Sequence, residues 1–146
     1  VRSRRQRQMC IRDRAKGGDW FGTVNAGENY GWKILGWGGT NYSGSKIGPK
    51  WKPGFTKPIK YWIPSIAVSA LTIYKGKEFQ EWNGDALITS LKDKSLRKIK
   101  FKENKLINEK IIFKGNIGRI RDIKIQETTG EIYMLSDRGE LWRMYK

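Results

Sequence analysis

Two stretches of the chain, GDALITSLKDKSLRKIK at 84–100 and GEIYMLSDRGELWRMYK at 130–146, align with an offset of 46 residues. Four positions are identical between the two copies: Gly84 and Gly130, Ser90 and Ser136, Arg97 and Arg143, and Lys100 and Lys146. A period in the forties, with several strands in each repeat, is typical of a β-propeller blade. The second copy stops after its third strand, so this part of the chain is predicted to form about two blades.

Short apolar runs bounded by glycine or polar turn residues follow one another from residue 67 onward, which is typical of antiparallel strands. Hairpin turns are predicted at Thr128-Thr129-Gly130 and at Asp137-Arg138-Gly139. No strong helical pattern is present. The predicted strands are 67–74, 86–91, 96–101, 111–113, 120–125, 131–136 and 141–145. The fold class is therefore all-β, a partial propeller.

Residues 17–65 differ from this pattern because they are rich in glycine and aromatic residues and end in a series of prolines. Glycine and proline at this density interrupt regular structure and indicate long loops. The aromatic residues argue against disorder, since they supply apolar surface to bury. We expect this region to be a loop-rich part of a third blade.

Residues 1–16, VRSRRQRQMCIRDRAK, are arginine-rich and lack strand alternation. The stretch Arg7–Asp13 resembles a translated sequencing-adapter fragment, so we expect residues 1–16 to be a non-native basic arm and 17–146 to be the folded domain. The alternative is a native arm that binds nucleic acid or an anionic membrane.

The formal charge of +16 invites a nucleic-acid function, but its distribution weakens that interpretation. The arm holds seven of the 30 Lys and Arg residues, and the rest are spread through 17–146 together with 13 of the 14 acids. We expect a solvated basic surface and no nucleic-acid partner; nucleic-acid binding stays the alternative. No apolar run is long enough to span a membrane.

Residue types that are absent exclude several kinds of chemistry. The chain has no histidine, which removes the commonest general base and the usual metal ligand. Its one cysteine, Cys10, lies in the arm, so 17–146 has neither a disulfide framework nor a thiolate metal site.

Three cations on predicted strands are the candidate binding residues. Arg119 and Arg121 are two apart and share one face of a strand, while Lys92 ends the matching strand of the preceding repeat. Strand ends that converge on one rim would gather three positive charges for a small polyanion, because guanidinium groups pair carboxylates in bidentate fashion. The alternative is a solvated basic strand face.

Several short motifs in order resemble the glucose/sorbosone dehydrogenase family, the soluble quinoprotein sugar dehydrogenases. Their spacing is similar to the C-terminal part of the bacterial aldose sugar dehydrogenase branch. The motifs are Gly17-Gly18-Asp19, Asn29-Tyr30-Gly31-Trp32, Asn41-Tyr42-Ser43-Gly44, the 61–67 segment YWIPSIA, Ser90-Leu91-Lys92, Arg119-Ile120-Arg121-Asp122 and the 133–137 segment YMLSD.

The resemblance implies a six-bladed propeller that binds pyrroloquinoline quinone (PQQ) with calcium and oxidises aldose sugars at the anomeric carbon to lactones by hydride transfer. It also implies a periplasmic or secreted location and a possible homodimer of the parent protein. The implied cofactor contacts are Tyr42, Ser90, Leu91, Lys92, Arg119, Ile120 and Arg121, with Ser65 a lesser candidate. Asp122 is expected to orient an arginine or cap the strand, and Asp137 to belong to a hairpin turn.

Two departures from the family pattern limit what the resemblance implies for this chain. The family's catalytic base is a histidine, so no catalytic residue is assigned here, and the chain is expected to be an inactive C-terminal fragment. At a family calcium site, Trp20 stands where the family has a glutamate, and only the backbone carbonyl of Tyr30 matches. The alternative function is a non-catalytic propeller that binds a protein or a glycan.

Overall fold

The strands predicted from residue 67 onward form two antiparallel sheets in the computed structural model. The structure describes residues 8–12, 16–32 and 34–146, with side chains from residue 16 onward, and divides into two units at Ser65 and Ile66. Each unit is described by itself. Among the described residues, no helix has both the length and the apolar character needed to cross a membrane.

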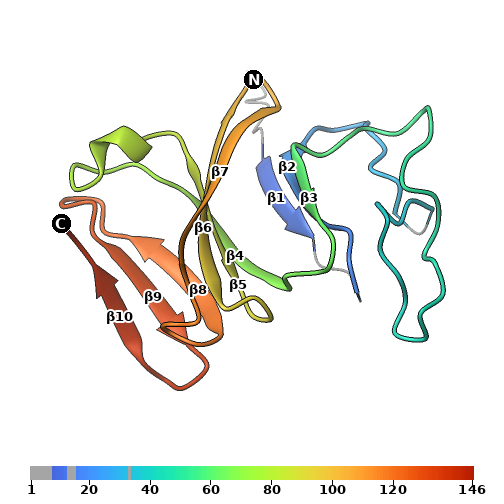
Figure 1. The fold of residues 1–146 in the computed structure, drawn as a ribbon. Helices are drawn as coiled ribbons and strands as arrows, with labels where there is room; N and C mark the ends of the chain where they lie inside the picture. Colours follow the sequence, from blue (N-terminus) through green and yellow to red (C-terminus); the bar gives the residue numbers. More distant parts are fainter. Residues whose placement is uncertain (1–7, 13–15, 33) are drawn as a thin grey trace. The chain divides into compact units, whose positions relative to one another are not determined.

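The second unit holds one four-stranded and one three-stranded sheet, which confirms the all-β fold and the two blade-like repeats (Figure 1). The first sheet has the order β4-β5-β6-β7 and the second the order β8-β9-β10. The strands are β4 (Val68–Ile73), β5 (Ala86–Ser90), β6 (Ser95–Lys102), β7 (Lys105–Lys114), β8 (Ile120–Ile125), β9 (Ile132–Ser136) and β10 (Leu141–Met144). A single 3-10 turn, η1 (Gln80–Trp82), interrupts the connection from β4 to β5.

Strand β7 is much longer than the predicted run at 111–113. It pairs with β6 through a two-residue hairpin turn, in which Glu103 and Asn104 both have positive φ, 49° and 62°. Such turns usually carry glycine, so this one gives no strong signal in the sequence. The first half of β7 is mostly exposed and does not alternate between apolar and polar residues, so the sequence pattern does not indicate a strand there.

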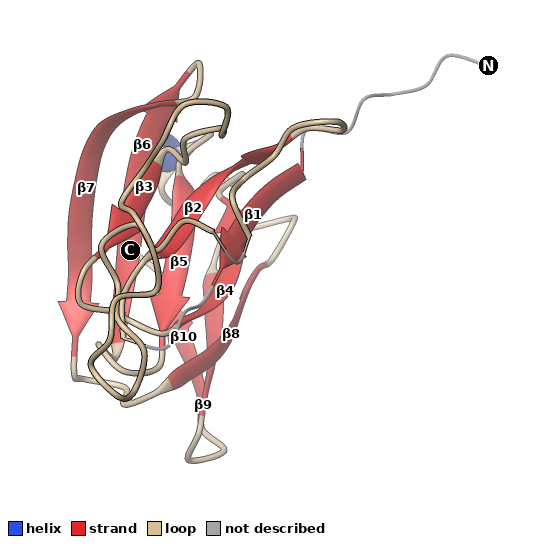
Figure 2. Ribbon diagram, turned by 90° about the vertical axis from the view of Figure 1, so that its right-hand side faces the viewer, coloured by secondary structure: helices blue, strands red, loops and turns tan. Residues whose placement is uncertain are grey.

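The core of the second unit lies between the two sheets and takes residues from both: Tyr74, Leu87 and Leu96 from one side, and Ile120, Ile132 and Met134 from the other. Strand β5 is buried at every position, because it lies inside its sheet and its faces are covered. The first strands, β4 and β8, lie side by side (Figure 1 and Figure 2). One polar contact joins them, because Ser69 Oγ of β4 donates to the carbonyl oxygen of Ile120 at 2.6 Å. The same hydroxyl lies 2.9 Å from Thr89 Oγ1 on β5.

The first unit contains strands where only loops were expected. Its sheet has the order β1-β2-β3, from β1 (Gln8–Arg12), β2 (Asp19–Val24) and β3 (Lys60–Trp62). Strand β2 has almost no exposed position and so shows no alternation, and β3 is only three residues long. Sequence periodicity therefore missed both strands.

The arm that was expected to stand apart from the fold contributes β1, which pairs with β2 in antiparallel register from Gln8↔Val24 to Arg12↔Trp20. The rest of the arm lies outside the described residues, except for Lys16. Strand pairing uses backbone groups, which a native and a non-native sequence both have. The pairing of β1 therefore does not test whether residues 1–16 are native, and their non-native origin stays a prediction.

The core of the first unit is aromatic. Trp20, Leu35 and Trp37 are buried, and two tyrosines pack against them. The rings of Trp20 and Tyr30 stack at 5.6 Å, and those of Trp37 and Tyr61 lie 5.7 Å apart. Residues 25–59 connect β2 to β3 mainly through turns, so the loop-rich character predicted for this region is confirmed for that segment.

Candidate anion-binding site

The three predicted cations come to one end of the two sheets in the second unit. Lys92 lies two residues after Ser90, the last residue of β5, which pairs with the first residue of β4. The Ser69 contact with Ile120 places the start of β8 beside the same end of β4. Lys92, Arg119 and Arg121 therefore share one rim, which we call the cation rim.

A β-bulge and a carboxylate fix the direction of the two arginines. Ile120 pairs with Ser136 and Asp122 with Leu135, so the register shifts at Arg121. Asp137 Oδ2 accepts from Arg121 Nη2 at 3.2 Å, and its Oδ1 accepts from Arg121 Nε. Arg119 forms an ion pair with the same carboxylate, with its Nε 2.9 Å from Asp137 Oδ2. About half of each arginine side chain remains exposed, at 51% and 50%.

The contacts of Asp137 with the two arginines were not predicted from the sequence. Asp137 does lie in the predicted hairpin turn, which Gly139 closes by donating its N–H to the carbonyl of Ser136. The turn signal gave no indication of the contacts with both arginines. Asp122, expected to orient an arginine or cap the strand, instead accepts a local hydrogen bond from the backbone N–H of Ile123 at 2.8 Å.

The hydrogen bond from Arg121, together with the positive charges of Arg121 and Arg119, lowers the pKa of Asp137. The same hydrogen bond raises the pKa of Arg121. The carboxylate and the guanidinium groups are therefore charged together at neutral pH. With one carboxylate against three cations, the rim keeps a net positive charge.

Lys92 differs from the arginines in having an exposed side chain that forms no ion pair with the described residues. Its backbone N–H donates to the carbonyl of Ile66 at 3.1 Å, which ties the turn after β5 to the start of β4. The neighbouring Asp93 does not neutralise it, because that carboxylate accepts from Arg97, from Lys114 at 2.5 Å and from Ser95 at 2.8 Å. Burial opposes the ionisation of Asp93, but these three donors lower its pKa to about 2.

Three other predicted contact residues, Ser90, Leu91 and Ile120, form the framework of the rim. The Ser90 hydroxyl is buried and lies 3.0 Å from Ser95 Oγ. The N–H of Leu91 donates to the carbonyl of Ala67 at 2.8 Å. The Ile120 side chain belongs to the core. Their contact with a cofactor stays a prediction, and their interactions in the structure are within the protein.

In the first unit, Tyr42 occupies the tip of a turn and is 78% exposed. Asn41 closes that turn by donating its backbone N–H to the carbonyl of Ser45 at 2.8 Å. Ser65 is buried and donates its hydroxyl to Asp19 Oδ2 at 2.7 Å. Tyr42 is thus accessible to a ligand, whereas the Ser65 hydroxyl is engaged with a buried carboxylate.

The segment expected to bind calcium does not fit that ion. The side chain of Trp20 is buried against the ring of Tyr30, and its indole N–H has no acceptor among the described residues. An indole offers no oxygen, and calcium requires six to eight oxygen ligands. No group of three or more His, Cys, Asp or Glu side chains in the described part of the chain could hold a metal ion.

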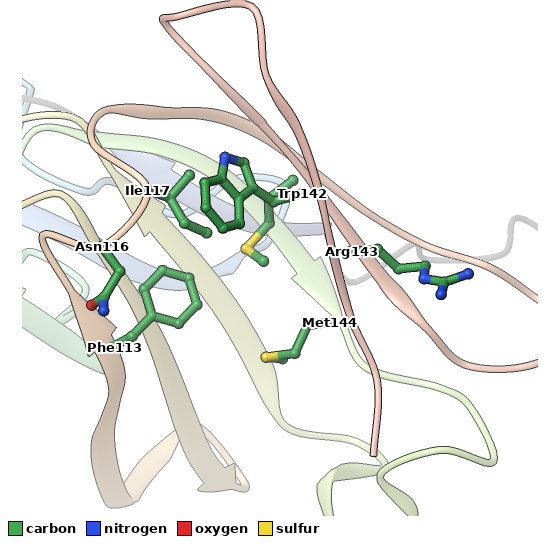
Figure 3. Close-up of a pocket in the computed structure, with 7 residues that line it drawn as sticks. Phe113, Asn116, Ile117, Trp142, Arg143 and Met144 are labelled. Atoms are coloured by element: carbon green, nitrogen blue, oxygen red, sulfur yellow. The ribbon is translucent and has the colours of Figure 1, made fainter.

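A small apolar cavity of about 230 Å³ also lies in the second unit, near the ends of β7 and β10. Figure 3 shows Phe113, Ile117, Trp142 and Met144 around it, while the guanidinium of Arg143 points away. With no cation directed into it, this cavity does not suit a polyanion and is separate from the cation rim.

Two known proteins are similar to this chain in sequence. The aldose sugar dehydrogenase YliI of Escherichia coli is 35% identical over 135 residues, and the uncharacterized protein slr1608 of Synechocystis sp. is 33% identical over 134. These matches cover 88% and 89% of this chain but 36% and 32% of the relatives, so the chain spans about a third of their length.

Solved structures match as well. The apo form of the E. coli soluble aldose sugar dehydrogenase superposes with a TM-score of 0.81 at 31% identity, covering 94% of this chain and 41% of that one. The PQQ-bound aldose sugar dehydrogenase of Streptomyces coelicolor shares the fold, with a TM-score of 0.68 at 17% identity, over 98% of this chain and 41% of that one. The family model described as glucose/sorbosone dehydrogenase matches residues 14–143, and the chain belongs to that family.

Proposed function

We propose that the cation rim is one wall of a PQQ-binding site in an aldose sugar dehydrogenase. The observation that carries the proposal is the convergence of Lys92, Arg119 and Arg121 at one end of two adjacent sheets. PQQ carries three carboxylates, and these cations offer an unpaired ammonium and two half-exposed guanidinium groups. The family membership and the relatives named as aldose sugar dehydrogenases support this assignment.

PQQ, when bound, supplies a quinone that accepts a hydride from the anomeric carbon of the sugar. The role of this chain is to bind and orient the cofactor through the rim. The assignment of Tyr42 as a cofactor contact rests on the family resemblance alone. The 146 residues include no histidine to accept the hydroxyl proton, and a positioned general base contributes about 10²–10⁴-fold to such reactions. We therefore expect the 146-residue chain to bind PQQ without oxidising sugar.

Calcium forms no part of the proposal at Trp20 and Tyr30, where the side chains do not suit it. The remaining parts of the proposal rest on the family resemblance alone. They are a sugar substrate, a periplasmic or secreted location, and a homodimer.

The test is a titration of the full chain with PQQ, followed by the absorbance of the quinone and the quenching of tryptophan fluorescence. Lys92→Gln and Arg121→Gln should each weaken binding about tenfold, because each removes a charge-assisted contact with a carboxylate. The matched control is Lys124→Gln, which removes one exposed positive charge from the other end of β8 and should change the dissociation constant less than about twofold.

Equal weakening by all three variants would mean that PQQ responds only to the net charge of the chain, and the rim would lose its assignment. Absence of PQQ binding by the folded wild-type chain would overturn the proposal and favour a non-catalytic binding protein. Dye reduction with glucose, PQQ and calcium should stay at background; sugar-dependent reduction would contradict the expected lack of catalysis.

A further inference from the structure

Asp137 contacts the arginine pair in a way that leaves particular nitrogens free. Its carboxylate takes the Nε edge of Arg119, and both Nε and Nη2 of Arg121. Within the described part of the chain, both Nη nitrogens of Arg119 and Nη1 of Arg121 have no partner. The free donors thus belong to the outer parts of the two guanidinium groups, away from the carboxylate.

The backbone around Asp137 is also tied to the arginine strand. Its N–H donates to the carbonyl of Arg119 at 2.9 Å, directly before β8 begins. The turn that carries the carboxylate and the bulge that carries Arg121 are therefore held together by main-chain as well as side-chain contacts. This gives the carboxylate a fixed place from which to hold two long side chains.

We propose that Asp137 is a positioning residue, which fixes Arg119 and Arg121 so that their free guanidinium nitrogens form a preorganised receptor for carboxylates. The identity of the ligand, a polycarboxylate of the PQQ type, rests on the proposed function above. Arginine side chains lose much conformational freedom when they bind a ligand, and an anchor that orders them beforehand reduces that cost.

A different role for Asp137 makes the opposite prediction. If the carboxylate only neutralised excess positive charge, its removal would raise the charge of the rim by one unit and strengthen anion binding. If it positions the arginines, its removal should weaken binding even though the rim becomes more positive. The sign of the change therefore distinguishes the two roles.

The experiment compares Asp137→Asn with Asp122→Asn in the full chain. Both variants remove one negative charge within the same region. Among the described residues, however, the Asp122 carboxylate accepts a hydrogen bond only from the backbone N–H of Ile123, and an asparagine oxygen can still accept that bond. We expect Asp137→Asn to weaken PQQ binding about tenfold and Asp122→Asn to leave it unchanged or slightly tighter.

A second measurement does not depend on PQQ. The Nε–H resonance of Arg121, assigned by its loss in Arg121→Lys, should exchange slowly with water in the wild-type chain, because Asp137 Oδ1 accepts from this group. It should exchange about tenfold faster in Asp137→Asn, because its acceptor is weakened, and at the wild-type rate in Asp122→Asn.

These two measurements separate the failures. If the wild-type chain does not bind PQQ but the Nε–H of Arg121 is protected by Asp137, the proposed function fails and the arginine anchor stands. If the exchange rates are equal in wild type and Asp137→Asn, or if Asp137→Asn binds PQQ more tightly, the positioning role is overturned.

Discussion

The two units of this chain hold their backbone in different ways. In the second unit, seven strands pair in long antiparallel ladders, and most turns between them are short. In the first unit, residues 25–59 run between two strands mainly through turns, around a core of stacked aromatic rings. Where strands pair regularly, the backbone hydrogen bonds are satisfied by neighbouring strands, and side chains at the strand ends remain available for binding. Where the chain is irregular, segments of backbone approach so closely that only glycine fits.

The largest expected effect is a loss of stability when a glycine in the first unit is replaced. Gly18 has φ +85°, and an added Cβ would lie 2.4 Å from the carbonyl oxygen of Gly36. Gly18→Ala should lower the free energy of unfolding by about 3 kcal/mol, from the left-handed backbone and the overlap together. Urea denaturation followed by tryptophan fluorescence measures this, since Trp20 and Trp37 lie in the same core.

Gly44 provides the matched control, because its φ is +86° and an added Cβ there would meet nothing within 4 Å. Gly44→Ala should therefore show only the backbone cost of about 1 kcal/mol. Equal losses in the two variants would mean that close backbone packing does not distinguish Gly18.

A smaller effect tests whether the second unit depends on single polar contacts between its sheets. The buried Tyr74 hydroxyl donates to the carbonyl of Gly130 at 2.7 Å and accepts from the N–H of Phe79 at 3.0 Å. Tyr74→Phe leaves both groups unsatisfied and should lower the free energy of unfolding by about 2 kcal/mol in urea denaturation. Tyr42→Phe, at an exposed ring, should change it by less than about 0.5 kcal/mol; a similar loss in both would contradict the role of the buried contact.

The smallest effect concerns acid stability in the second unit. The pKa of Asp93 is lowered to about 2 in the folded chain, from an ordinary value of 3.8. A depressed carboxyl pKa stabilises the fold above the unfolded value, and that contribution is lost as the pH falls from about 4 to about 2. The difference in unfolding free energy between wild type and Asp93→Asn should shrink by about 1–2 kcal/mol over this range. A pH-independent difference would show that the carboxylate charge is not what stabilises the turn after β5.

The sequence predicted more of the second unit than of the first for a physical reason. Strands there alternate or are bounded by turn residues, so 120–125 agrees with β8 and 131–136 with β9 to within one residue. Strand β2 has almost no exposed position and β3 only three residues, so neither carries a period-2 pattern. The turn at Glu103-Asn104 was missed because its left-handed residues are not glycines.

The candidate site was also predicted from the sequence only in part. Residue type and spacing predicted that Lys92, Arg119 and Arg121 lie together, with the two arginines on one strand face. In the structure Arg119 precedes β8 and Arg121 lies at the bulge, so the shared contact with Asp137 brings the two side chains together and regular alternation does not. Spacing gave no indication that the Ser90 hydroxyl contacts Ser95 or that the Ile120 side chain lies in the core, because burial depends on the neighbouring strands. The indole of Trp20 supplies no oxygen where the family pattern has a glutamate, and the backbone carbonyl of Tyr30 as a calcium ligand stays a prediction.

The sequence by itself determined the repeat and the all-β class, because these follow from residue types at regular spacing, and the resemblance of its ordered motifs indicated the family. Only the tertiary structure decided how the cations are held: Asp137 lies 16 residues from Arg121, and they meet through the β8–β9 pairing and the bulge between Ile120 and Asp122. A contact of that kind depends on register and turn geometry, which local sequence patterns do not encode.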